Sequence, residues 1–264
     1  MDTGNLRDEL AFFGGGRDIE KAIRLLIDVG WDGPLPLLRQ LDATEQDPDW
    51  HPEGNVLTHS LMAADAAAAA ADRDHLDPAE RELVVFAALL HDAGKPTTTV
   101  RTAGGRVTSH GHDAQGAAVA RRFMLDIGSP QALADKIAVL TREHMAHATL
   151  GDDPTPAALR RLVRRLGDGQ VTIDEWARVV DADRAGRGPG SKPPRGSLWA
   201  RRARHLAPLR TPLLRGEDLM ELGWEPGPEF GAVIQASLEA QDDGAFVDHD
   251  GAVRWLRASQ FTAP

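Results

Sequence analysis

A nearly all-apolar segment that ends in a histidine and an aspartate constrains this chain more than any other feature. Residues 83–90 are continuously apolar within a segment at 79–91, and Pro78 before this segment suits the first turn of a helix. We predict that these residues form a central helix, covered on all sides by the rest of the fold. The segment brings the imidazole of His91 and the carboxylate of Asp92 into the interior side by side, and Gly94 then ends it. Nitrogen and oxygen donors of this kind are ligands of divalent metal ions.

Helical periodicity dominates the rest of the sequence, so the predicted fold class is all-α. Further helices are predicted at residues 19–29, 35–41, 56–71, 114–127, 130–144, 156–166, 173–185, 216–223 and 230–240. Residues 47–54 have turn chemistry and are predicted as a loop. Residues 97–109 indicate a small hairpin or flap, and near residues 245–247 a short strand is an open alternative.

The composition changes at residue 184. Residues 184–216 contain nine basic and no acidic residues, in a chain whose formal net charge is −10. This stretch is predicted either to form one wall of an anion-attracting groove or to be a solvated loop that pairs with the excess acids. We expect an N-terminal helical segment at residues 1–50, a main domain at 51–205 and a small helical appendage at 206–264.

The composition also limits the class of protein. The chain has no cysteine, so disulfides and thiolate metal sites are excluded and any metal must have N and O ligands. The first residues lack the basic-then-apolar layout of a signal peptide, and no run of about 18 apolar residues predicts a membrane span. The acidic balance argues against coating nucleic acid by bulk charge. We expect a cytoplasmic protein with no membrane contact.

Six residues that fall on or at the ends of predicted helices are candidate metal ligands. A helical bundle can direct such side chains from facing helices to one site in its core. The six candidates are His59, His91, Asp92, His112, His144 and Asp183. One ion needs three or four ligands, and a second would take His112 and His144, with Asp92 as the bridging carboxylate.

The remaining histidines and one aspartate leave alternatives open. On chemistry alone, His110 is nearly as good a ligand as His112, and Asp181 competes in the same way with Asp183. The other histidines are interpreted as ordinary core or surface residues: His51, His75, His147, His205 and His249.

The order of these residues carries a family resemblance. His59, then His91-Asp92, then Asp183 resembles the pattern of the HD metal-dependent phosphohydrolase superfamily. From about residue 20 to the end, the chain is similar to the HD region and C-terminal tail of bacterial CCA-adding tRNA nucleotidyltransferases. The segments that carry this similarity are His51-Pro-Glu-Gly-Asn-Val-Leu-Thr-His59, His91-Asp-Ala-Gly-Lys-Pro96, His110-Gly-His-Asp-Ala-Gln-Gly116, Glu143-His-Met145, Asp183-Arg-Ala-Gly-Arg187 and Leu213-Leu-Arg-Gly-Glu-Asp-Leu-Met-Glu-Leu-Gly223.

The resemblance implies an HD-domain helical bundle over residues 51–205 with a small helical C-terminal appendage. It also implies phosphodiesterase or phosphatase activity, and it assigns the six candidates as ligands, with His112 preferred to His110 and Asp183 to Asp181. The expected cofactor is one or two divalent transition metal ions, drawn from Mn, Ni, Co, Fe and Zn, with Mg also acceptable.

The nucleotidyltransferase head of that family is not predicted in this sequence. Gly14-Gly-Gly-Arg-Asp18 followed by Glu20 echoes its Gly-rich loop and carboxylates, but the spacing is too tight and no strands follow. We interpret these residues as a flexible start in which Asp18 caps the first helix, so CCA addition is not expected.

The expected reaction is metal-assisted hydrolysis of a nucleotide-type phosphoester, with 2′,3′-cyclic nucleotides and RNA ends as candidates. The metal lowers the pKa of bound water toward about 7, Asp92 holds the metal, and Lys95 and Arg187 contact the phosphate. His110 is a candidate substrate contact, and Asp113 is a candidate proton donor to the leaving oxygen. The alternatives are a non-catalytic RNA-binding or partner-docking module and a nucleotide sensor. Oligomeric state is not predicted.

Overall fold

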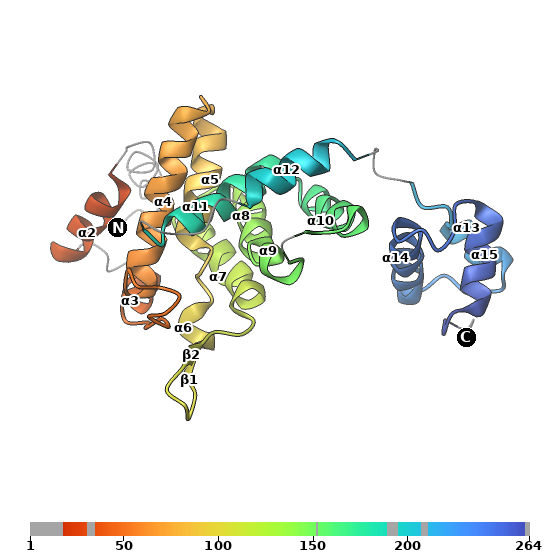
Figure 1. Cartoon of the computed structure of the whole chain (residues 1–264), viewed down its shortest axis with the longest axis horizontal. Helices are drawn as coiled ribbons and strands as arrows, with labels where there is room; N and C mark the ends of the chain where they lie inside the picture. The colour runs from red at the N-terminus through yellow and green to blue at the C-terminus, as the bar shows by residue number, and fades with distance from the viewer. Residues whose placement is uncertain (1–17, 31–34, 152, 189–194, 207–210, 262–264) are drawn as a thin grey trace. The chain divides into compact units, whose positions relative to one another are not determined.

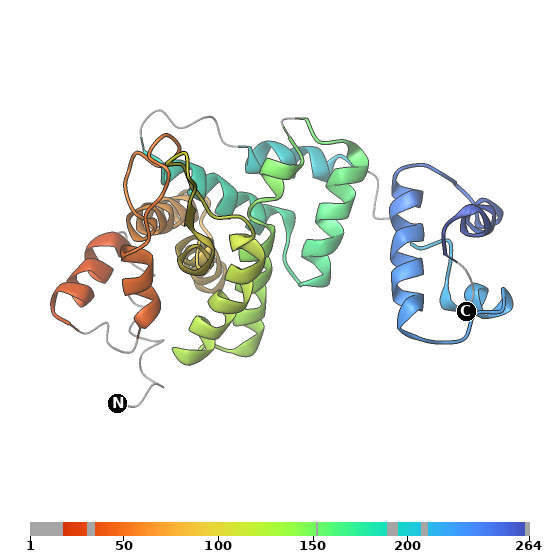
Figure 2. The same cartoon turned by 90° about the horizontal axis from the view of Figure 1, so that it is seen from below.

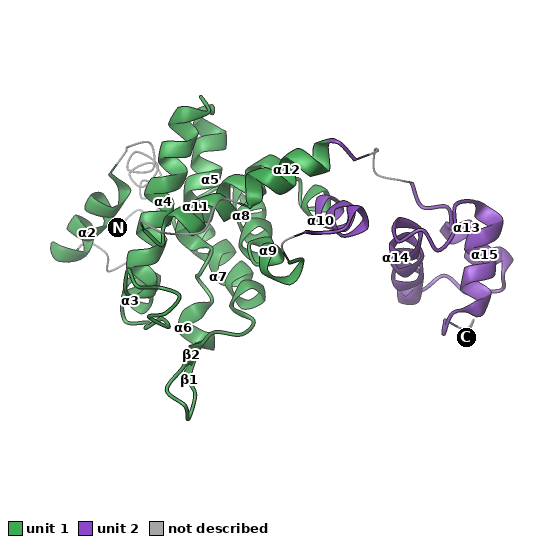
Figure 3. Ribbon diagram, in the orientation of Figure 1, with its two compact units in different colours: residues 1–152, 165–204 green, residues 153–164, 205–264 purple. Residues whose placement is uncertain are grey.

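The computed structural model describes residues 18–30, 35–151, 153–188, 195–206 and 211–261. In this part of the chain the prediction of an all-α fold is confirmed, with one two-stranded hairpin as the only sheet (Figure 1). Gly14–Arg17 of the predicted flexible start lie outside the described residues. The chain divides into two compact units, the first made of Met1–Asp152 and Arg165–Arg204, the second of Asp153–Arg164 and His205–Pro264 (Figure 3).

The first unit is a helical bundle. Its helices and strands are α2 (Ile19–Asp28), α3 (Pro36–Asp42), α4 (Val56–Arg73), α5 (Pro78–Leu90), α6 (Lys95–Thr98), β1 (Val100–Arg101), β2 (Val107–Thr108), α7 (His112–Asp126), α8 (Gln131–Glu143), α9 (Ala146–Thr149), α11 (Ile173–Ala185) and α12 (Gly196–Arg204). The helix α10 (Pro156–Asp168) begins in the second unit and ends in the first.

Helix α5 lies at the centre of this unit, as its apolar sequence predicts. Every residue from Leu83 to Leu90 is buried, and α5 packs against α4, α8 and α11. An Asp77–Glu80 capping box satisfies the free backbone N–H groups at its start. Helices α7 and α8 run side by side next to it (Figures 1 and 2). The end of α5 therefore lies where four helices meet.

The first described helix, α2, is capped by a different residue from the one predicted. Asp18 occupies the N-cap position, but its side chain makes no capping hydrogen bond and pairs with Lys21 instead. The backbone N–H groups of Ile19 and Glu20 donate to the Asp65 carboxylate on α4, at 2.7 and 3.4 Å. A tertiary contact thus replaces the local cap and fixes α2 against α4.

The predicted hairpin at residues 97–109 is present and short. Val100 pairs with Thr108 and Arg101 with Val107 in antiparallel register. The hydroxyls of Thr99 and Ser109 lie 2.7 Å apart and close the base of the hairpin, directly before α7. The hairpin therefore sets where the first residue of α7, His112, begins its helix.

The second unit has its own small core. Helices α13 (Gly216–Glu221), α14 (Pro228–Asp242) and α15 (His249–Ala258) surround a cluster of buried apolar residues. The cluster comprises Leu214, Leu219, Trp224, Val233, Phe246, Ala252 and Leu256. Residues 245–247 form no strand, and α15 after them was not predicted. Arg161 and Arg164 pair with Asp243 and Asp242 within this unit.

Among the helices that the structure describes, none combines the length and the apolar character that crossing a bilayer requires.

Candidate metal centre

The six candidate ligands come from five separate parts of the first unit. His59 lies on α4 and Asp183 on α11, while His112 is the first residue of α7. His91 and His144 are the C-cap residues of α5 and α8, and Asp92 follows in the turn after α5. All six side chains are buried, with exposed fractions of 0–9%. Burying a titratable side chain without polar partners costs free energy. Each of the six is therefore expected to have polar partners.

Three of the six form one group. His59 Nε2 lies 3.0 Å from Asp183 Oδ1 and 3.2 Å from His91 Nε2, and His91 Nε2 lies 3.7 Å from the same Asp183 oxygen. These atoms are close enough to be ligands of a single ion. The ends of α4, α5 and α11 therefore bring two imidazoles and a carboxylate to one point.

The other three form a second group. His112 Nε2 lies 3.2 Å from His144 Nε2 and 3.2 Å from Asp92 Oδ1, and His144 Nε2 lies 3.9 Å from that oxygen. These atoms also meet the distance requirement for binding one ion.

The Asp92 carboxylate lies between the two groups. Its Oδ1 faces His112 and His144, whereas its Oδ2 lies 3.2 Å from His91 Nε2 and 3.9 Å from His59 Nε2. One carboxylate thus offers an oxygen to each group, which is the arrangement of a carboxylate that bridges two metal ions.

The four imidazoles are oriented so that each points Nε2 into the centre. In His91, His112 and His144 the Nδ1 atom lies 2.5–2.7 Å from a backbone carbonyl oxygen three residues earlier, to which it donates. In His59 the Nδ1 atom lies 2.7 Å from Glu53 Oε1. With Nδ1 as the donor, each neutral ring keeps a lone pair on Nε2. Lone pairs that face one another at 3.2 Å repel unless a cation lies between them, so this donor set fits a divalent metal.

The charges of the centre agree with this geometry. Burial opposes ionisation of Asp92, but the Lys95 ammonium and the His91 and His112 rings hold its pKa well below the usual value. Burial also opposes protonation of His59, but Asp183 and Glu53 outweigh it and raise the pKa of His59 to about 9. Burial lowers the pKa of His144 to about 3, so this ring is neutral and able to bind metal. Without metal, protonated His59 balances the carboxylates together with Lys95 and Arg187.

Two cationic side chains border the centre. Lys95 begins the short helix α6 and is buried, with Nζ 2.7 Å from Asp92 Oδ2 and 2.6 Å from Gln46 Oε1. Arg187, which follows α11, lies 3.4 Å from Asp183 Oδ1 through Nη2 and is half-buried.

The structure does not bring every predicted residue into the cluster. His110 is exposed and Asp113 half-buried, and within the described ranges neither has a recorded polar contact with the six ligands. Asp181 faces away from the centre and accepts hydrogen bonds from the backbone N–H groups of Gly196 and Ser197, at 2.8 and 2.9 Å. Asp181 thus fixes the start of α12, and Asp183 alone of this pair reaches the imidazoles.

Glu53 and His51 belong to the surroundings of the centre although the sequence did not single them out. Glu53 Oε1 lies 2.8 Å from His51 Nδ1 as well as 2.7 Å from His59 Nδ1, and its side chain is 4% exposed. The two rings make an edge contact at 4.7 Å. The available signal was the turn-rich 47–54 segment directly before α4, in which Glu53 precedes His59 by only a few residues.

A close approach of two backbones positions His112 against Asp92. A Cβ at Gly94 would lie 2.1 Å from the His112 carbonyl oxygen and 2.6 Å from the Gly116 nitrogen. A Cβ at Gly116 would in turn lie 2.9 Å from the Gly94 nitrogen. Only glycine at both positions lets the turn after α5 contact α7 this closely.

The match to a family model agrees with the helical fold of the first unit. Residues 56–182 match the model described as the HD domain. This part of the chain is therefore an HD domain, a helical module typical of the metal-dependent phosphohydrolase superfamily, in which divalent metals are bound.

The curated relatives are tRNA nucleotidyltransferases. The chain is 35% identical over 169 residues to the A-adding tRNA nucleotidyltransferase of Deinococcus radiodurans and 33% identical over 167 residues to the CC-adding tRNA nucleotidyltransferase of Thermus thermophilus. Each match covers 60% of this chain, but only 37% and 36% of the relatives. A multifunctional CCA protein of Halorhodospira halophila is 40% identical over 118 residues, 44% of this chain and 26% of the relative. The chain thus spans little more than a third of the relatives it matches, and its HD domain resembles theirs.

Proposed function

We propose that the first unit is a metal-dependent phosphohydrolase that cleaves a nucleotide-type phosphoester. The observation that carries this proposal is the position of Asp92, whose two carboxylate oxygens face two separate groups of buried ligands. A non-catalytic module gains nothing from keeping six titratable side chains buried at a cost in stability.

The proposed ligands are His59, His91 and Asp183 for one ion, His112 and His144 for a second, and Asp92 for both. Imidazole and carboxylate donors without thiolates suit Mn, Fe, Co, Ni and Zn, and the carboxylates also suit Mg. A divalent metal bound here would supply an activated water and offset charge on the phosphoryl oxygens.

The other residues have supporting roles in this proposal. Lys95 holds Asp92 in position through the 2.7 Å contact between Nζ and Oδ2, and its charge favours an anionic substrate. Arg187, half-buried beside Asp183, is the proposed contact to a phosphoryl oxygen. His110 and Asp113 flank His112 at the start of α7. We propose His110 as a substrate contact and Asp113 as the proton donor to the leaving oxygen.

The relatives support the choice of substrate class. Their printed names are A-adding and CC-adding tRNA nucleotidyltransferases, proteins that act on tRNA. For this chain we infer a nucleotide or an RNA end, including a 2′,3′-cyclic phosphate. Residues 1–50 are proposed as a segment that packs on the HD domain at 51–205, with 206–264 as an appendage.

Metal content and hydrolysis should be measured on matched variants. Purified protein should contain a transition metal, and with Mn, Ni, Co or Mg it should release phosphate from a phosphoester or open 2′,3′-cyclic nucleotides. Asp92→Ala should lose both properties, whereas Asp181→Asn, which changes a carboxylate outside the centre, should keep both. Full metal binding without turnover on a broad phosphoester panel would indicate a nucleotide sensor. Protein that binds no metal, or Asp92→Ala with unchanged turnover, would refute the proposal.

A further inference from the structure

A groove on the first unit lies away from the six ligands, between α4, α11 and α12. Its volume is about 630 Å³. Alanines from all three helices line the groove, and their small side chains leave open the space that larger residues would fill. These are Ala66, Ala70, Ala177, Ala182, Ala185 and Ala200. Below it α12 is fixed to α11 by the stacked rings of Trp176 and Trp199, at 5.8 Å.

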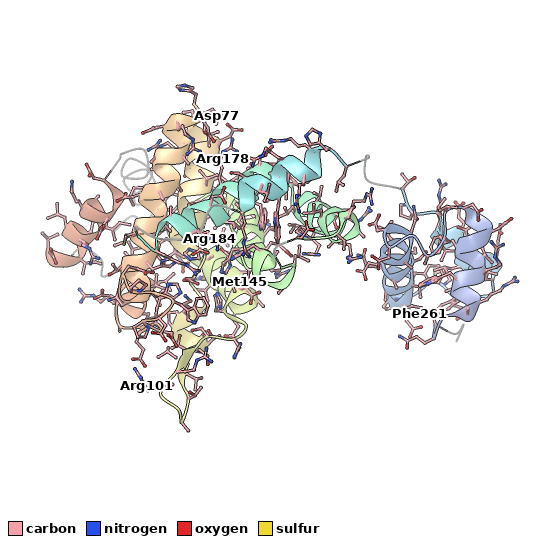
Figure 4. The ribbon with its side chains drawn as sticks, in the orientation of Figure 1. Asp77, Arg101, Met145, Arg178, Arg184 and Phe261 are labelled. Carbon is pink, nitrogen blue, oxygen red and sulfur yellow. The ribbon has the colours of Figure 1, made fainter. Side chains whose placement is uncertain are left out.

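Arginines form most of the polar lining of this groove. Five arginines contribute, namely Arg73, Arg178, Arg184, Arg201 and Arg204, against three aspartates, Asp74, Asp174 and Asp181. Arg178 and Arg184 lie at two points along α11 (Figure 4).

All three aspartates of the groove already have partners. Asp74 pairs with Arg73 at 2.8 Å and with Arg178 at 3.1 Å. Asp174 pairs with Arg204 at 2.7 Å, and Asp181 binds the start of α12. In the part of the chain that the structure describes, no ion pair is recorded for Arg184 or Arg201. Their charges are therefore available to a ligand.

Arg184 connects the groove to the metal centre. It follows Asp183 in α11, and the next arginine, Arg187, reaches Asp183 Oδ1 at 3.4 Å. Arg184 itself lines the groove. A line of positive charge thus leads from the centre along the end of α11 into the groove.

We propose that this groove binds the phosphodiester backbone of a single RNA strand whose end lies in the metal centre. The choice of RNA rests on the proposed function. A strand offers repeated negative charges that match a line of arginines. Among the residues that the structure describes, no aromatic side chain lines the groove, so it would contact phosphates rather than stack bases. Duplex RNA is recognised across a broad surface, whereas a groove of this size takes one strand.

The proposal is tested by RNA binding at several salt concentrations. The full chain, kept in EDTA to prevent hydrolysis, is titrated into a fluorescein-labelled oligouridylate and followed by fluorescence anisotropy. Each phosphate contact adds about 0.7 to the slope of log affinity against log salt for single strands. Arg184→Ala with Arg201→Ala should therefore reduce the slope by about 1.4. Arg184→Lys with Arg201→Lys should keep most of it, because the charges remain.

Arg121→Ala with Arg122→Ala is the matched control. Both arginines lie on α7, where Arg121 pairs with Asp135 and Arg122 with Asp126, so their removal also takes away two positive charges without touching the groove. It should leave the slope unchanged. If the double alanine variant, folded by circular dichroism, binds RNA with the wild-type affinity and slope, the proposal is wrong. The proposal would also be overturned if polyglutamate displaced the labelled oligouridylate as effectively as unlabelled RNA does. That result would favour an acidic protein partner.

The test of RNA binding by the groove can be distinguished from the test of hydrolysis. Binding in EDTA needs neither metal nor turnover, so RNA binding and hydrolysis are measured independently of each other. If the wild type binds RNA, the double alanine variant shows the reduced salt slope and no hydrolysis is found, the proposed function is refuted and RNA binding by the groove is supported. Hydrolysis of small cyclic nucleotides without RNA binding would do the reverse.

Discussion

Replacing Gly94 by alanine tests whether the contact between the turn after α5 and α7 builds the metal centre. The added Cβ would lie 2.1 Å from the His112 carbonyl oxygen, whereas ordinary contact begins at 3.4 Å. The two backbones must therefore separate by roughly 1.3 Å, since the obstructing atoms are backbone and cannot rotate away. His112 begins at this point of contact, so the same shift lengthens the 3.2 Å distance between its Nε2 and Asp92 Oδ1.

Two effects should follow, and both can be measured. Overpacking of this kind costs about 2–3 kcal/mol, so the melting temperature in EDTA should fall by about 4–12 °C. Metal affinity, measured by calorimetry on the folded variant, should fall at least tenfold, because displacement of ligands by about 1 Å exceeds what such a site tolerates.

Gly104→Ala is the matched control for this substitution. Gly104 lies in the turn between β1 and β2, and a Cβ there would have nothing within 4 Å. This variant should therefore retain wild-type stability and affinity. If Gly94→Ala behaved like Gly104→Ala in both measurements, the close approach would not position the centre and the reasoning would be wrong.

Three further predictions concern the centre and its support. Glu53→Gln should weaken metal binding about 10–100-fold, because the carboxylate that faces His59 Nδ1 is lost, while Glu45→Gln at an exposed ion pair should leave calorimetric affinity unchanged. Metal at about 100 times its dissociation constant should raise the free energy of unfolding by about 2.7 kcal/mol. In thermal melts, the Asp183→Asn variant should lose much of this stabilisation by metal, whereas Asp181→Asn should retain it. Asp65→Ala should lower the free energy of unfolding by about 1 kcal/mol, since the start of α2 loses its acceptor, whereas Asp49→Ala should be neutral.

Much of the fold was predictable because local sequence patterns indicate where its helices form. Residues 83–90 are apolar on all sides of the predicted helix, which predicts burial on all sides, and α5 is the central helix. The helix predicted at residues 173–185 has the bounds of α11, where Thr172 and Glu175 form a capping box. The cap of α2 was wrongly predicted because its acceptor, Asp65, is 46 residues away in the chain. Helix α12 was not predicted because the Gly and Pro residues before it, and the basic residues within it, indicate a loop.

The ligand groups were predictable only as a set. Chemistry alone could not separate Asp181 from Asp183. Residues that are two apart on a helix lie on nearly opposite faces, and only packing decides which face points inward. The same holds for His110 and His112, of which only the second lies inside α7. Glu53 could not be identified from its sequence, since a glutamate in a turn has no distinctive spacing. Its position depends on how the loop before α4 returns to His59.

The distance along the chain between the ligands determines when this centre can exist. His59 and Asp183 are separated by 124 residues, yet their side chains are 3.0 Å apart. During synthesis the site near His59 stays incomplete until α11 has emerged from the ribosome and docked. The group of His59, His91 and Asp183 therefore becomes complete late in the folding of the first unit, whereas Asp92, His112 and His144 can come together before α11 docks.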